Sequence, residues 1–200
     1  MTTMTTQSIL SMVTRLRQAS SCPSFLTTEN IESTKILRAI DLVEQITSNG
    51  NKVVVFSVFK ESANKLYEKL KDYNPLLCTG DVDDLTIQEN IKKFQSDNNY
   101  KVFIGTFAKC STGITLTSAS YMICIDSCWT AALCQQAEDR IHRIGSKEPV
   151  FIYYLTCKNT IDERVEEIVQ DKGAISDYVV DDNVSLNQME SLKKYLLELQ

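Results

Sequence analysis

The chain lacks any apolar run near the roughly 18–20 residues that a membrane-spanning helix needs. Its first ten residues, MTTMTTQSIL, also lack the basic and apolar segments of a secretory signal. We therefore expect a cytoplasmic or nuclear protein in a reducing compartment, with no membrane partner.

Positive charge and metal-ligand spacings are also scarce. The 21 Lys and Arg residues are outnumbered by 26 Asp and Glu, for a formal net charge of −5, which excludes a uniformly basic surface for nucleic acid but not a local basic patch. Seven cysteines never occur as Cys-x-x-Cys, and His142 is the one histidine in the sequence, so we expect no structural metal site. Most of the cysteines are interpreted as small buried apolar residues.

What is present is a repeated alternation of apolar patterns over 200 residues. Short β-branched or apolar runs typical of buried strands alternate with segments whose apolar residues follow helical spacing. This order predicts an α/β fold, a parallel sheet with helices on both faces. The final helix either packs back on the domain or binds a partner. The expected strands are 52–58, 76–78, 101–105, 121–126 and 150–155, and the expected helices are 7–19, 33–48, 60–72, 85–95, 130–143, 161–172 and 186–200.

Ligands of parallel sheets bind at the carboxyl ends of the strands. One loop at such an end, Gly105–Ala119, is rich in hydroxyl side chains and glycine, a composition that suits phosphate binding but is common in loops. The sequence has no GxxxxGK[ST] motif and no DExD-type acidic box, so we do not expect it to hold ATP unaided.

The segment Gln135–Gly145, QQAEDRIHRIG, carries the sharpest pattern. On a continuous helix, Gln136, Arg140 and Arg143 share one face, and two guanidinium groups at that spacing could anchor a polyphosphate. The alternative is an ordinary solvated face, with i,i+4 pairs joining Asp139 to Arg143 and Glu138 to His142. Spacing alone leaves both interpretations open.

The residues from about 7 to 172 resemble the second RecA-like lobe of Swi/Snf-type superfamily-two DNA-dependent ATPases. The motif Gln136–Gly145 is the most specific part of this resemblance, together with Gly113, Asp126 and Trp129. Further similarity lies in Lys52–Phe59, in Asn159–Arg164, and in Leu16–Ala19 with Cys22 and Pro23.

The resemblance implies a double-stranded DNA translocase or remodeller whose ATP and Mg²⁺ are held mainly by a separate N-terminal RecA-like lobe. It implies that Arg140 and Arg143 are catalytic and that Gly113 and Gln136 bind the nucleotide. The implied DNA-backbone contacts are Ser57, Thr79, Gly80, Thr106 and Ser111, while Trp129 is more simply a packing residue than a base-stacking one. The expected organisation is an N-terminal helix and linker at 1–31, the lobe at 32–172, and a connector and helix at 173–200.

The sequence departs from the family pattern in one loop especially. A small-residue motif reads Lys109-Cys110-Ser111-Thr112-Gly113 here, Thr115 replaces a frequent Asn, and Ser146 stands where Gln is usual. Because Lys109 is a large charged residue where the family has a small one, the sequence does not determine the path of this loop. Two alternatives to the translocase therefore remain: an inert RecA-like module that binds DNA or protein, and the second lobe of an RNA-directed helicase. The absent first lobe is expected either on a longer version of this chain or on a separate chain.

Overall fold

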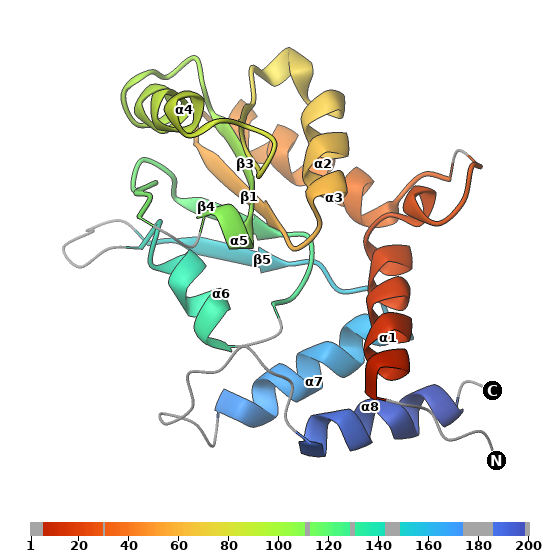
Figure 1. The fold of residues 1–200 in the computed structure, drawn as a ribbon. Helices are drawn as coiled ribbons and strands as arrows, with labels where there is room; N and C mark the ends of the chain where they lie inside the picture. The colour runs from red at the N-terminus through yellow and green to blue at the C-terminus, as the bar shows by residue number, and fades with distance from the viewer. Residues whose placement is uncertain are drawn as a thin grey trace.

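A five-stranded parallel sheet forms the centre of the computed structural model, which describes residues 6–29, 31–110, 113–128, 131–142, 149–173 and 186–198 (Figure 1). The strand order is β2-β3-β1-β4-β5, and all four neighbouring pairs are parallel. The strands are β1 (Val53–Ser57), β2 (Leu76–Cys78), β3 (Val102–Thr106), β4 (Tyr121–Cys124) and β5 (Phe151–Tyr154).

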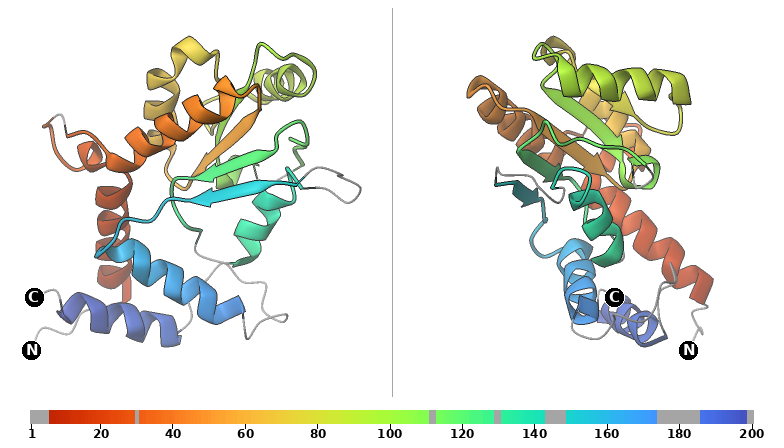
Figure 2. Two further views of the ribbon diagram at one scale, coloured as in Figure 1. Left: turned by 180° about the vertical axis from the view of Figure 1, so that it is seen from behind. Right: turned by 90° about the vertical axis from the view of Figure 1, so that its left-hand side faces the viewer.

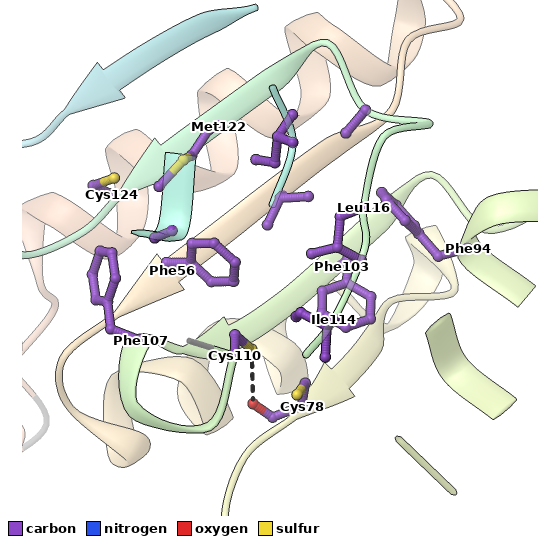
Figure 3. Close-up of a cluster of buried hydrophobic side chains, with 14 of the residues drawn as sticks. Phe56, Cys78, Phe94, Phe103, Phe107, Cys110, Ile114, Leu116, Met122 and Cys124 are labelled. Carbon is purple, nitrogen blue, oxygen red and sulfur yellow. Dashed lines mark hydrogen bonds between the residues drawn. The ribbon is translucent and has the colours of Figure 1, made fainter. Parts of the chain in front are cut away.

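Helices cover both faces of this sheet, as the sequence predicts (Figure 2). Successive side chains of β1 alternate between the faces: Val53 and Val55 pack with α2 (Thr34–Ser48) and α3 (Lys60–Lys69), whereas Val54 and Phe56 face the opposite side. That side is covered by α4 (Asp84–Ser96), α5 (Phe107–Cys110) and α6 (Ala131–Glu138) and holds the aromatic and cysteine-rich core drawn in Figure 3.

Three further helices form a smaller cluster below the sheet, namely α1 (Thr6–Ser21), α7 (Ile161–Gly173) and α8 (Leu186–Glu198) (Figure 1). The last helix packs back on the domain through Leu192 and Leu196, which are 0% and 2% exposed. Their apolar partners are Ile9 and Val13 of α1 and Ile161, Val165 and Ile168 of α7. No helix in the described ranges combines the length and apolarity required to span a membrane.

Helix boundaries differ from the sequence expectation at two places near the strand ends. The helix expected over 130–143 ends at Glu138, and a turn comes after it in which Arg140 N and Ile141 N donate to carbonyls three residues back. The short helix α5 was not expected. Its residues Phe107 and Cys110 are three apart and both buried in the core. Packing therefore stabilises this helical turn, although the composition of the segment is typical of a loop.

Candidate functional site at the carboxyl ends of the strands

The candidate site lies where the chain reverses direction across the sheet. From β1 the chain runs out to β2 and back to β3 on one side, and then crosses β1 to β4 and β5. The carboxyl ends of β1 and β4 are therefore the topological switch point, where α/β sheets bind ligands. Ser57 ends β1, and Asp126 lies two residues beyond β4.

Ser57 is an internal residue in this structure, although the family resemblance implies that it contacts DNA. It is 1% exposed, and its hydroxyl donates a 2.6 Å hydrogen bond to Asp126 Oδ2 and accepts one from Phe59 N at 3.0 Å. Asp126 Oδ2 also accepts from Val58 N at 3.2 Å. The Ser57 hydroxyl thus holds the turn after β1 to the end of β4, and little of this residue reaches the surface of the lobe.

At the ends of β2 and β3 the threonine side chains are largely buried, and the backbone of Gly80 is exposed. Thr79 is fully buried, and its Oγ1 has no hydrogen-bond partner in the described part of the chain. Thr106 is 6% exposed, so only a small part of this residue reaches the surface. Gly80 is exposed inside a turn closed by the 3.1 Å bond from Val82 N to Thr79 O, and an added Cβ would meet no atom within 4 Å.

Two lysines lie beside this turn, each paired with an aspartate. Lys60 Nζ is 3.0 Å from Asp81 Oδ1, and Lys109 Nζ is 2.7 Å from Asp84 Oδ1. The hydrogen bond to Asp84 raises the pKa of Lys109. Lys109 departs from the family pattern, so the sequence did not determine the path of its loop. In the structure Lys109 lies in α5, and its side chain reaches the first turn of α4.

The loop after α5 and the end of α6 are joined by backbone. Leu116 N donates a 2.8 Å hydrogen bond to Arg140 O, which brings the segment containing Gly113 beside the arginine predicted to be catalytic. Gly113 has φ +69°, a conformation that other residues rarely adopt, and its Cα faces open space. The structure thus ties the loop that contains Gly113 to the segment that contains Arg140 through the Leu116 backbone.

Arg140 lies in the turn beyond α6 and is partly buried. Its neighbours Ala137 and Ile141 are 2% and 1% exposed in the core, and its Nε is buried without a hydrogen-bond partner among the described residues. A buried guanidinium nitrogen without an acceptor is costly, so it suits a site completed by an anion. Gln136 is exposed on α6.

The two acidic residues of the predicted solvated face, Glu138 and Asp139, each accept a side-chain hydrogen bond from a described residue. Glu138 accepts a 2.5 Å hydrogen bond from the Tyr154 hydroxyl, and burial together with this bond raises the pKa of Tyr154. Asp139 accepts from the Gln135 side chain at 3.1 Å. Arg143, Ser111 and Trp129 lie outside the described residues.

Sequence reasoning missed a set of buried charges beneath the switch point. Arg17 and Lys35 are each 3% exposed, and Asp126 and Asp162 are 3% and 7% exposed. Burial lowers the pKa of Arg17, while the two carboxylates raise it. A signal was present in the sequence, because Lys35 precedes Ala39 by four residues and Leu42 by seven, which puts it on a buried face of α2.

No group of three or more His, Cys, Asp or Glu side chains within the described ranges could hold a metal ion. Of the seven cysteines, Cys22, Cys78, Cys110, Cys124 and Cys128 are buried, whereas Cys134 and Cys157 are only partly buried.

Comparison with known proteins agrees with this architecture. Residues 34–145 match the family described as helicase conserved C-terminal domain. A DNA excision repair protein ERCC-6-like from Bos taurus is 34% identical over 137 residues, which are 67% of this chain and 11% of that protein. The chain therefore spans about a tenth of that relative's length.

Solved structures show the same fold. The C-terminal part of the Fun30 ATPase domain superposes with a TM-score of 0.71 at 27% identity, covering 84% of this chain and 55% of that one. The Sulfolobus solfataricus SWI2/SNF2 ATPase core in complex with dsDNA gives 0.72 at 23% identity, covering 94% and 42%. Together, the family match and the fold place this chain in the helicase conserved C-terminal domain family, as a C-terminal lobe of the Swi/Snf type.

Proposed function

We propose that this chain is the second motor lobe of an ATP-dependent double-stranded DNA translocase or remodeller. It supplies Arg140 and Arg143 to a nucleotide held by a first lobe, and it contacts the DNA backbone at the carboxyl ends of β2 and β3. The observation that supports this most directly is the Leu116–Arg140 hydrogen bond, which joins the Gly113 loop to the arginine segment.

The nucleotide side of the proposal depends on Arg140, Gly113 and their neighbours. ATP with Mg²⁺, when bound by the first lobe, would supply a triphosphate whose transferred phosphoryl group and leaving oxygen carry negative charge in the transition state, and cationic side chains stabilise that charge. Arg140 offers a buried Nε without a partner in the described residues, which an acceptor oxygen would satisfy. Gly113 leaves open space beside its backbone, and Gln136 is exposed on the preceding helix.

The DNA side of the proposal changes with the structure. Because the Ser57, Thr79 and Thr106 side chains are buried, a phosphate would meet the exposed backbone around Gly80. Backbone N–H contacts position DNA without reading its sequence. Lys60 and Lys109 would add charge if a phosphate displaced Asp81 and Asp84 from them. Ser111 remains a proposed contact from the resemblance.

The deciding experiment measures DNA-stimulated ATP hydrolysis by this lobe assembled with a first lobe. Arg143→Ala and Arg140→Ala should each lower kcat by roughly 100-fold or more, because an arginine acting on the transferred phosphate contributes that much. Arg143→Lys should restore little, since an ammonium cannot reproduce the planar fork of donors. Arg38→Ala, on the exposed face of α2, is the matched control and should leave kcat unchanged.

Either of two results would contradict the proposal. A normal kcat in folded Arg140→Ala and Arg143→Ala variants would show that both arginines belong to a plain solvated surface. Stimulation by RNA but not by double-stranded DNA would identify the lobe as part of an RNA-directed helicase.

A further inference from the structure

Four buried charges connect the N-terminal helices and α7 to the switch point of the sheet. Lys35 Nζ of α2 lies 2.6 Å from Asp162 Oδ2 and 3.7 Å from Asp126 Oδ1. A guanidinium nitrogen of Arg17 donates to the backbone carbonyl of Ser127, the residue after Asp126. The positive charges of Arg17 and Lys35 equal in number the negative charges of Asp126 and Asp162.

Each carboxylate is held by further donors. Asp162 accepts from Ser20 Oγ of α1 at 2.7 Å and from Cys157 N at 3.0 Å. Asp126 accepts from Ser57 Oγ and Val58 N at the end of β1. The Arg17 guanidinium also lies 5.8 Å from the centre of the Phe59 ring, just past the end of β1. The network therefore touches α1, α2, the ends of β1 and β4, and the start of α7.

Stability alone is a poor reason for such a network. Burying four charges costs desolvation, and well-packed apolar replacements of buried ion pairs are often neutral or stabilising. What the charges provide is a defined position for the segment after β4. Residues 125–128 precede α6 in the chain, and Cys128 belongs to the same buried cluster as Ala137 of α6, with Cys134 packed against it. Arg140 lies two residues beyond the end of α6, and its carbonyl accepts the hydrogen bond from Leu116 N.

We propose that Arg17 and Asp126 are positioning residues, which hold residues 125–128 against α1 and so fix where residues 131–142, which include Arg140, lie. Lys35 and Asp162 balance their charge and anchor α2 and α7. This inference rests on the proposed ATPase function for its catalytic consequence, but the positioning itself belongs to this chain alone.

Two double variants separate positioning from charge balance. Arg17→Met with Asp126→Asn removes one cation and one anion and breaks the tie to Ser127. Lys35→Met with Asp162→Asn also removes one of each but leaves that tie intact. Asp162→Asn alone leaves excess buried positive charge and should lower Tm by roughly 10 °C, whereas both doubles should unfold within a few degrees of the parent.

The two doubles should differ in their effect on the chain beyond β4. In the assembled ATPase, Arg17→Met/Asp126→Asn should lower kcat by about tenfold with little change in the KM for ATP, and Lys35→Met/Asp162→Asn should keep kcat within about twofold. In the 200-residue chain, amides of residues 131–142 should exchange with deuterium faster in the first double only. Arg17→Lys, which keeps the buried charge, provides a second variant and should show the same two changes more weakly.

Equal exchange and equal kcat in the two doubles would overturn the inference, and so would normal values in Arg17→Lys should the first double fail to fold. An assembly that hydrolyses no ATP in its parent form would refute the proposed function instead. In that case the exchange measurement still decides whether Arg17 and Asp126 position the segment.

Discussion

Replacing Gly105 by Ala should destabilise the lobe through one collision in the core. Gly105 lies in β3, where a Cβ would sit 2.4 Å from Cys110 Sγ and 3.1 Å from the backbone oxygen of Cys78. Figure 3 shows Cys110 above Cys78, and its Sγ is 3.8 Å from the Cys78 oxygen. The Cys110 side chain therefore occupies the space that Gly105 leaves free.

The expected loss of stability depends on how far the atoms around the added Cβ can move. Cys110 is 1% exposed and Cys78 is fully buried, so the sulfur has no solvent to swing into, and the Cys78 oxygen belongs to β2. Overpacking a well-filled core costs typically 1–3 kcal/mol, and we expect about 2 kcal/mol here. For a chain of 200 residues this lowers Tm by roughly 4–8 °C.

Urea unfolding of the 200-residue chain and a double-mutant cycle with Cys110→Ala would measure it. Removing the sulfur alone should cost about 1 kcal/mol of lost packing. The double variant should be more stable than the sum of the single effects by at least about 1 kcal/mol, because the collision is gone. Gly80→Ala, with open space around its Cα, is the control and should stay within about 0.5 kcal/mol. Additive effects in the cycle, or an unchanged Gly105→Ala, would refute the steric argument.

Three other tests concern the Gly113 loop, the activity of the chain by itself and the N-cap of α4. Gly113→Ala should cost about 1–2 kcal/mol in urea unfolding because Gly113 has φ +69°, and a loss no larger than that of Gly80→Ala would contradict this. The 200-residue chain without a first lobe should show negligible DNA-stimulated ATP hydrolysis, and measurable turnover by the pure chain would disprove it. Hydrogen bonds from Thr86 lower the pKa of Asp83, the N-cap of α4. Its stabilisation should therefore be present above the unfolded-state pKa of about 3.9 and be lost as pH falls below it, and the stability profile of Asp83→Asn from pH 5 to 2 should be flatter than the parent's.

Regular elements were predictable because local pattern and burial agree in them. The run Val53–Phe56 is apolar at every position, as a strand covered on both sides requires, and all four residues are fully buried. Ser33 was expected to cap the second helix, and its hydroxyl does accept from Ile36 N at 3.2 Å. In both cases the information lies within a few residues of the chain.

The candidate site was less predictable because its geometry depends on partners distant in sequence. The end of α6 could not be read from its helical pattern, since the Arg140 carbonyl bonds Leu116, which lies 24 residues earlier. The hydrogen bond that holds the Ser57 hydroxyl inside the domain could not be read from the local sequence, because its partner Asp126 is 69 residues away. Residue type alone does not show which polar groups near a strand end turn inward.

The burial of these hydroxyls changes how an acidic chain could hold DNA. Ser57, Thr79 and Thr106 are each 6% exposed or less, so among the described residues the proposed DNA edge offers the backbone at Gly80, the exposed Lys60 and the partly exposed Lys109. Both lysines already pair with exposed aspartates, and such surface pairs contribute roughly 0–1 kcal/mol. A phosphate can therefore displace the carboxylates at little cost, but it then lies beside two negative groups. Each lysine adds less attraction than an unpaired one would, so under the proposed function the backbone turn at Gly80 carries most of the positioning and the salt dependence contributed by this lobe is shallow.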